Sequence, residues 1–171
     1  MRIIEFFGGP GSGKTTTATH AFSAFKQMGI ECEFVREYAQ EAIYCGQKHH
    51  LDSQFIVAAN QYRKYKEQEL AGTKLVFSDT SMLLSKVYGD ITHPGRQYLN
   101  ALIDILQDEF EIVKVFIKRV KEYKTQGRLQ TEQEARELDI LMKSKCGPFD
   151  FAIPGDEQGI KSLLGNLNYV S

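Results

Sequence analysis

The sequence predicts an α/β fold, in which helices cover both faces of a parallel β-sheet. Short apolar segments typical of buried strands alternate along the chain with longer segments whose apolar residues recur at helical spacing. When helices connect successive strands, the strands lie parallel and the helices pack on the two faces of the sheet. A second observation agrees, because the apolar segment 2–7 is followed at once by a glycine-rich turn and a helical pattern. Together these features predict a three-layer α/β/α arrangement.

The first half of the chain is expected to contain two strands and three helices. The helical pattern that begins at Thr15 has its apolar residues on one face and stops near Gly29, a residue type that commonly ends helices. Asp52 or Ser53 can cap a longer helix. The apolar face of this longer helix is expected to consist of Phe55, Ala59, Tyr62 and Tyr65. The predicted elements of this half are strands at 2–7 and 32–36, and helices at 15–28, 38–44 and 53–70.

The second half of the chain alternates in the same way. The apolar run Leu75-Val76-Phe77 marks a third strand. Thr131 and Glu134 have the spacing of a capping box, which marks the start of a helix. The predicted elements of this half are strands at 73–78, 112–117 and 151–154, and helices at 81–88, 95–110 and 131–145, with a last helix from about 156.

Composition and charge bound the class of protein. The chain has 171 residues, of which 42% are hydrophobic, so we expect one globular domain over residues 1–171. Its net charge of −1 gives no electrostatic reason to bind an anionic membrane, and it disfavours nucleic acid as a partner. Apolar runs stay well short of the roughly 20 residues that a membrane span needs. The sequence does not fix the oligomeric state, and a homodimer is compatible with it.

The cysteines and the N-terminus indicate the compartment. Cys32, Cys45 and Cys146 form no C-x-x-C pair, and their number is odd, which is typical of reduced thiols. The first predicted strand begins almost at Met1, which leaves no room for a signal peptide. We therefore expect a cytoplasmic protein.

Residues 8–15 read Gly-Gly-Pro-Gly-Ser-Gly-Lys-Thr and fit the pattern G-x-x-x-x-G-K-[ST] of a phosphate-binding loop. The strand before it and the helix after it supply the required context, in which backbone N–H groups and a helix N-terminus surround the phosphates. We expect Lys14 to reach the β- and γ-phosphates of ATP and the Thr15 hydroxyl to ligate Mg²⁺. The residues expected to bind the nucleotide are Gly8, Gly9, Gly11, Ser12, Gly13, Lys14, Thr15 and Thr16.

Polar residues follow two other predicted strands, at the sheet edge where ligands of such folds bind. Asp79 follows the third strand and can hold Mg²⁺ beside Thr15. It can also cap the next helix, and the two roles are compatible. Glu37 follows the second strand and can orient an acceptor hydroxyl and take its proton. If the acceptor is a phosphate, no base is needed and Arg36 becomes a phosphate clamp. A surface pair of Arg36 and Glu37 is the third interpretation.

A basic segment and one helix face complete the candidate site. Residues 118–130 are polar and basic, and we expect them to form a lid over the phosphates, with a solvated basic loop as the alternative. Within the lid, Arg128 and then Arg119 are the strongest candidates for catalytic contacts, because a guanidinium makes forked contacts to phosphate. On the long helix, Gln61 shares a face with Gln54 and can pair with the edge of a base. A half-exposed helix with an ordinary core stripe is the simpler interpretation.

In these features the chain resembles the P-loop nucleoside and nucleotide kinases, and it is most similar to ribosylnicotinamide-kinase-like ATPases, including short phage-encoded members. The resemblance rests on the phosphate loop, on residues 35–39, 76–80 and 123–128, and on the order of elements over nearly the whole chain. It implies a five-stranded parallel core sheet, Mg-ATP as the donor, a carboxylate at Glu37 near the acceptor, and lid arginines over the phosphates. Asp79 is followed by threonine instead of the arginine common in such kinases, which leaves the acceptor class open.

These expectations describe an ATP-dependent phosphotransferase that moves the γ-phosphoryl group of Mg-ATP to a nucleoside or a nucleoside monophosphate. Catalysis in such an enzyme consists of positioning and charge neutralisation. Two alternatives stay open: a polynucleotide or modified-base kinase, and a non-enzymatic ATP-binding regulator or interaction protein. A signalling GTPase is disfavoured, because the sequence contains no Asn-Lys-x-Asp motif for reading guanine.

Overall fold

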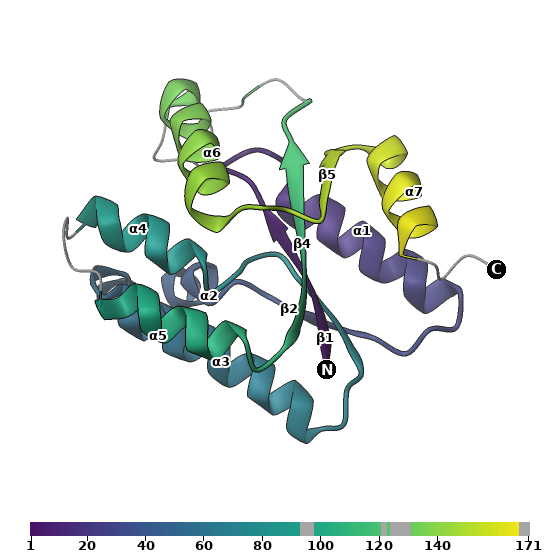
Figure 1. Ribbon diagram of the computed structural model, residues 1–171, viewed down its shortest axis with the longest axis horizontal. Helices are drawn as coiled ribbons and strands as arrows, with labels where there is room; N and C mark the ends of the chain where they lie inside the picture. Colours follow the sequence, from purple (N-terminus) through teal and green to yellow (C-terminus); the bar gives the residue numbers. More distant parts are fainter. Residues whose placement is uncertain (93–97, 121–122, 124–130, 168–171) are drawn as a thin grey trace.

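The computed structural model describes residues 1–92, 98–120, 123 and 131–167. Its centre is a parallel sheet of five strands in the order β2-β3-β1-β4-β5 (Figure 1). This sheet confirms the predicted α/β fold and the five-stranded parallel core. The strands are β1 (Arg2–Phe7), β2 (Glu33–Val35), β3 (Leu75–Ser78), β4 (Glu111–Lys118) and β5 (Phe151–Pro154).

Helices cover both faces of the sheet (Figure 1). They are α1 (Lys14–Gln27), α2 (Tyr38–Tyr44), the 3₁₀ helix η1 (Lys48–Asp52), α3 (Gln54–Leu70), α4 (Leu84–Thr92), α5 (Tyr98–Gln107), α6 (Glu132–Cys146) and α7 (Glu157–Asn166). Helices α1 and α7 share one apolar core with the sheet. Helices α3, α4, α5 and α6 share a second core on the opposite face. The short α2 and η1 connect β2 to α3.

The central strand β1 contributes to both cores. Its side chains alternate between the two faces, because successive residues of a strand point to opposite sides. Ile3 and Phe7 belong to the core under α3 to α6, whereas Ile4 and Phe6 belong to the core under α1 and α7. All four are fully buried, as expected for a strand that pairs with β3 on one side and β4 on the other. The loop after β1 therefore starts from a well-anchored position.

Most of the predicted elements agree with the observed ones to within a few residues. The capping box of α6 is confirmed, since Thr131 Oγ1 accepts a hydrogen bond from Glu134 N at 3.2 Å and Glu134 Oε2 accepts one from Thr131 N at 2.7 Å. The helix predicted at 81–88 begins later, at Leu84, and the described part of the helix predicted at 95–110 is Tyr98–Gln107. Part of the second of these predictions, residues 95–97, lies outside the described residues.

The buried face of α3 differs from the prediction. Phe55, which we expected on the apolar face, is 51% exposed. Ala58, Gln61 and Tyr65 are the buried residues of this helix, and their spacing of three and four residues places them on one face. The prediction is confirmed for Tyr65, which is fully buried, and for Tyr62, which packs against the core. It was wrong for Phe55, because it allowed only apolar residues on the buried face. The amide oxygen of Gln61 has a partner inside the protein, because it accepts a hydrogen bond from the backbone N–H of Tyr38 in α2.

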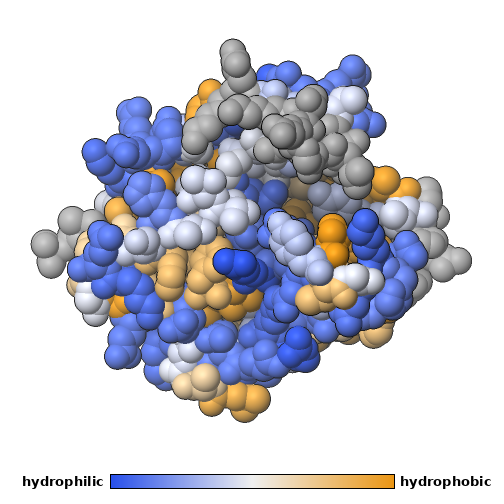
Figure 2. Space-filling view, turned by 180° about the vertical axis from the view of Figure 1, so that it is seen from behind, coloured by the Kyte–Doolittle hydropathy of each residue, from blue (hydrophilic) through white to orange (hydrophobic). Residues whose placement is uncertain are grey.

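Apolar residues reach the surface in small groups on the face drawn in Figure 2, where hydrophilic residues separate them. Exposed apolar residues in small groups are normal for a folded chain and indicate no particular partner. Within the described ranges, none of the helices combines the length and the apolar character needed to cross a membrane.

The carboxyl group of Glu5 lies inside the protein. Glu5 is fully buried in β1, where the Tyr65 hydroxyl donates a hydrogen bond to its Oε1 at 2.9 Å and Gln107 Nε2 donates one to its Oε2 at 2.7 Å. Burial raises the pKa of Glu5 from 4.5 to about 7, because desolvation penalises the charged form. Hydrogen bonds from Ser81, Gln107 and Tyr65 act in the opposite direction and lower it.

We expect Glu5→Gln to change how stability depends on pH. The raised pKa stabilises the folded state fully below about pH 4.5, and this contribution is lost as the pH rises through about 7. The variant has no such group, so its free energy of unfolding should increase relative to the wild type between about pH 5 and pH 8, by on the order of 3 kcal/mol. Urea unfolding at several pH values measures the difference. An identical difference at both ends of this range would contradict the expectation.

Candidate active site

The loop between β1 and α1 has backbone angles that residues other than glycine rarely adopt. Gly8, Gly11 and Gly13 have φ angles of +146°, +76° and +97°. A Cβ atom on Gly8 would also lie 2.6 Å from Ser12 Oγ. These three glycines allow the chain to curl tightly, which is the conformation in which successive N–H groups can surround an anion.

Helix α1 begins directly after this loop. Its N-cap residue is Gly13, and no side chain in the described part of the protein caps its first turn. The N–H groups of this turn are therefore open to an anion, which the helix dipole also attracts. Lys14 Nζ donates a hydrogen bond to the Gly8 carbonyl oxygen at 2.6 Å, so the ammonium group lies against the loop. Thr15 and Thr16 are exposed in the same turn. This arrangement can hold a chain of phosphates.

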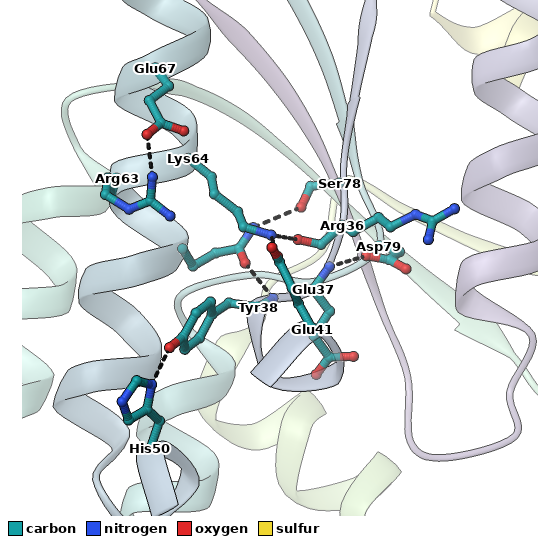
Figure 3. Close-up of polar contacts among 11 residues, drawn as sticks. Arg36, Glu37, Tyr38, Glu41, His50, Arg63, Lys64, Glu67, Ser78 and Asp79 are labelled. Carbon is teal, nitrogen blue, oxygen red and sulfur yellow. Dashed lines mark hydrogen bonds and ion pairs between the residues drawn. The ribbon is translucent and has the colours of Figure 1, made fainter. Parts of the chain in front are cut away.

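Asp79 lies at the end of β3 and is only 1% exposed. Its Oδ1 accepts a hydrogen bond from Glu37 N at 2.8 Å (Figure 3). Its Oδ2 is buried and has no hydrogen-bond partner among the residues that the structure describes. A buried carboxylate oxygen without a partner is costly unless a ligand binds it. The Thr15 hydroxyl and the Asp79 carboxylate are oxygen ligands of the kind that Mg²⁺ prefers, so these residues fit a magnesium ion.

Glu37 is the N-cap residue of α2 and follows β2. Burial raises the pKa of its carboxyl group, whereas the positive charge of Lys14 lowers it and the negative charge of Asp79 raises it further. Lys14 and Asp79 therefore both lie close enough to Glu37 to act on its charge. They come from the ends of β1, β2 and β3, which meet at one edge because the strands are parallel.

A cavity of about 430 Å³ opens beside Glu37. Its wall also includes Pro10 of the phosphate-binding loop, so the cavity borders the place where phosphates are expected. Apolar and aromatic side chains of α2 and α4 form much of the remaining wall, among them Ile43 and Tyr88. The ring of Tyr38 is held there by a hydrogen bond between its hydroxyl and His50 Nδ1 (Figure 3). This cavity was not predictable from local sequence patterns, because its wall combines residues from several separate elements.

The structure separates the two residues that we predicted to bind substrate. Arg36 is exposed, its side chain points away from α3 (Figure 3), and it lines a different hollow between α2 and α3. Gln61 lines the cavity but is only 2% exposed. Its Oε1 accepts a hydrogen bond from Tyr38 N at 3.1 Å, and its Nε2 lies 3.5 Å from Ser78 Oγ. Gln61 thus supports the cavity wall, and base reading by its amide stays a prediction.

Arg119 lies beneath the phosphate-binding loop, with a side chain that is only 6% exposed. It donates hydrogen bonds to the Pro10 carbonyl oxygen at 2.8 Å and to Asp139 Oδ2 at 3.1 Å. The other oxygen of Asp139 accepts a hydrogen bond from Gly9 N. Asp139 therefore ties α6 to both the loop and Arg119. Sequence reasoning missed Asp139, because a carboxylate within a charged helix carries no local signal of a distant partner.

Most of the predicted lid lies outside the residues that the structure describes. Arg128 and residues 121–122 and 124–130 lie outside the described residues. A role for Arg128 over the phosphates therefore stays a prediction.

The chain belongs to the AAA domain family, whose model matches residues 3–151. Among solved structures it is similar to that of the NadR protein in complex with NR, with a TM-score of 0.70 and 20% sequence identity. This match covers 96% of the present chain and 51% of the NadR chain, so the chain spans about half the length of that protein. No curated protein matches the chain. The family and the fold confirm a nucleotide-binding P-loop fold and the resemblance to ribosylnicotinamide-kinase-like proteins.

We expect Gly9→Ala to destabilise the protein through the contact between the loop and α6. A Cβ atom at this position would lie 2.5 Å from the Ala135 carbonyl oxygen and 2.8 Å from Asp139 Oδ1. Because a backbone oxygen cannot rotate away, α6 or the loop must shift, at a cost of about 1–3 kcal/mol. The control is Gly165→Ala in α7, where a Cβ meets nothing within 4 Å and should stabilise the helix by up to about 1 kcal/mol. Urea unfolding compares the two variants, and equal effects would refute the expectation.

Proposed function

We propose that this protein is a kinase that transfers the γ-phosphoryl group of Mg-ATP to a hydroxyl group of a nucleoside, with residues 1–171 acting as one P-loop kinase-like domain. The observation that carries the proposal is the position of the cavity, which Pro10 of the phosphate-binding loop and Glu37 both line. An acceptor bound there lies beside the terminal phosphate of a nucleotide bound at the loop. Such proximity supplies much of the rate enhancement in phosphoryl transfer.

The donor half of the proposed site consists of the loop and the first turn of α1. The loop N–H groups and Lys14 bind the phosphates, and Thr15 and Asp79 hold Mg²⁺. When bound, the metal neutralises charge on the β- and γ-phosphates. Arg128 and Arg119 are the proposed cations for the transferring group, and Arg119 has to leave Asp139 to take part.

The acceptor half of the proposed site favours an uncharged molecule. A volume of about 430 Å³ suits a small ligand such as a nucleoside. Tyr38 and Tyr88 offer aromatic surface to a planar base. Of the described residues, those that line the cavity include no lysine or arginine that could bind a phosphate on the acceptor. This argues for a nucleoside over a nucleoside monophosphate, and for Glu37 as a base over Arg36 as a phosphate clamp.

In the proposed reaction, Glu37 accepts a hydrogen bond from the acceptor hydroxyl and takes its proton. The hydroxyl oxygen forms a bond to the γ-phosphorus, and the bond from that phosphorus to the bridging oxygen of ADP breaks. Glu37 then releases the proton to solvent. The positive charge of Lys14 lowers the pKa of Glu37, so Lys14 favours the ionised form of this carboxylate as well as binding phosphate.

The proposal is tested by acceptor-stimulated release of ADP from Mg-ATP. The panel should contain nucleosides, nucleoside monophosphates, nicotinamide riboside and single-stranded oligonucleotides, and the NadR structure with NR is the reason to include the third. We expect strong stimulation by one nucleoside. Stimulation by oligonucleotide alone would favour a polynucleotide kinase, whose acceptor binding should weaken steeply with salt. ATP binding without stimulation by any acceptor would favour a nucleotide-binding regulator.

We expect Lys14→Ala to reduce turnover by at least about a hundredfold and to leave the fold intact. The substitution removes the ammonium group from the loop, and that charge is needed where negative charge develops. The matched control is Lys26→Ala in the same helix, which removes an exposed ion pair with Glu33 and a contact over the Phe22 ring, and should keep full activity. Steady-state kinetics and circular dichroism measure the two effects. Unchanged transfer in Lys14→Ala would rule out the mechanism.

We expect Glu37→Gln to lower kcat by about 10²–10⁴-fold, because the amide cannot take a proton. The raised pKa of Glu37 predicts that wild-type activity declines on the acidic side, as the carboxylate becomes protonated above its ordinary pKa of 4.5. The residual activity of Glu37→Gln should not show the loss at acidic pH that protonation of Glu37 causes in the wild type. A pH–rate profile of both proteins measures this, and a variant with full kcat would exclude Glu37 as the base.

A further inference from the structure

A buried hydrogen-bond network leads from the middle of the sheet to the cavity wall. We call it the Glu5 network, and its members are Glu5, Tyr65, Ser78 and Gln61. All four are at least nine-tenths buried. The Tyr65 hydroxyl oxygen lies 2.9 Å from Glu5 Oε1 and 3.0 Å from Ser78 Oγ, and Gln61 Nε2 lies 3.5 Å from Ser78 Oγ. No role described so far accounts for a fully buried carboxyl group at one end of this network.

The chemistry of its members gives the network a direction. The Tyr65 hydroxyl has one hydrogen to donate, and burial together with the charge of Glu5 raises the pKa of Tyr65 well above its ordinary value, so the hydrogen stays in place. An ionised Glu5 can only accept. Tyr65 therefore donates to Glu5, and the Ser78 hydroxyl is left to donate to Tyr65.

The hydrogen bonds between Ser78 and the start of α2 are also donated in the direction of Glu5. With its hydrogen directed at Tyr65, Ser78 Oγ presents lone pairs to Gln61 Nε2. This orientation of the Gln61 amide leaves Oε1 facing α2, where it accepts a hydrogen bond from Tyr38 N at 3.1 Å (Figure 3). Every donor from Tyr38 onward thus points toward Glu5, the one member that accepts and does not donate.

The far end of the network lies beside Glu37. Asp79 Oδ1 accepts from Glu37 N at 2.8 Å, and Gln61 Oε1 accepts from the next amide, that of Tyr38. Two successive peptide groups at the start of α2 are therefore held by buried side chains. Because Glu37 is the N-cap residue of this helix, the direction of its side chain depends on the orientation of these two peptide groups.

We infer that Glu5, through Tyr65, Ser78 and Gln61, positions Glu37 for its reaction with the acceptor. The inference rests on the proposed function of Glu37, and it makes the four members of the network positioning residues. Protonation of Glu5 places a donor where the network requires an acceptor. The hydrogen of Tyr65 can then turn to the Thr80 carbonyl oxygen, which lies 3.3 Å away, and the orientation of the Gln61 amide is no longer enforced.

The groups that face Glu5 come from the elements packed around β1. They are Tyr65 of α3, Ser81 after β3, Gln107 of α5, Lys114 of β4 and Cys146 of α6. Burial raises the pKa of the Cys146 thiol to about 12 and raises that of Tyr65 well above its ordinary value. Near neutral pH, Glu5 is therefore the member of this cluster that changes its charge.

The kinetic test compares two tyrosines on α3. Tyr65→Phe removes the hydroxyl that connects Glu5 to Ser78, whereas Tyr62→Phe removes a hydroxyl that donates to Glu109 at the surface. We expect Tyr65→Phe to lower kcat by about tenfold with the KM for ATP unchanged, because a misplaced base slows the chemical step without affecting donor binding. Tyr62→Phe should keep the wild-type kcat. Equal kcat values in the two variants would overturn the inference.

A second test needs no turnover. In a Glu37→Gln background, which removes the titration of Glu37 itself, NMR follows the Tyr38 backbone amide from about pH 5 to pH 9. We expect the chemical shift of this amide to show an inflection near the pKa of Glu5. Adding Tyr62→Phe should preserve the inflection, whereas adding either Tyr65→Phe or Glu5→Gln should abolish it. Glu5→Gln keeps the size of the side chain, so it serves if Tyr65→Phe does not fold.

Each outcome of the NMR test either supports the inference or overturns it. No inflection in the background protein means that the network does not reach Tyr38, and an inflection that survives in Glu5→Gln assigns the titration to another group. Either result overturns the inference. If the wild type phosphorylates no acceptor at all, the proposed function fails, but the NMR result still decides whether Glu5 controls the Tyr38 amide.

Discussion

The position of β1 between β3 and β4 is the constraint on which the rest of this structure depends. A parallel strand with neighbours on both sides is buried on both faces, and residues 3–7 of β1, up to its end, are fully buried. The phosphate-binding loop starts from this end. The same geometry brings Asp79 and Glu37, which follow the two strands on one side of β1, to the edge where the loop begins.

The features that the sequence predicted are those set by neighbouring residues. Strands and helices follow from local periodicity, and the phosphate-binding loop is eight consecutive residues whose glycines have the backbone angles that the motif requires. The cavity and the Asp139 contact were not predictable in this way. Each combines residues far apart in sequence, and nothing local in an isolated helix identifies the partner of one carboxylate.

The buried face of α3 and the interior of β1 illustrate the same limit. A polar residue such as Gln61 or Glu5 is buried only because partners from other elements satisfy it, and those partners are known only once the fold is known. The carboxylate in the run Ile-Ile-Glu-Phe-Phe is itself a usable signal, since a charged residue inside a buried strand requires a partner. Such a signal predicts that a network exists without identifying its members.

The two halves of the candidate site are built from different parts of the chain. The phosphates are expected at the β1–α1 loop, whereas the cavity wall comes largely from the segment that includes α2 and the first turns of α3, and from α4. Side chains such as Ile43, Leu51 and Val57 can therefore change without altering the loop. This separation allows the acceptor preference to drift in evolution, or to be redesigned, while the machinery for the donor stays the same.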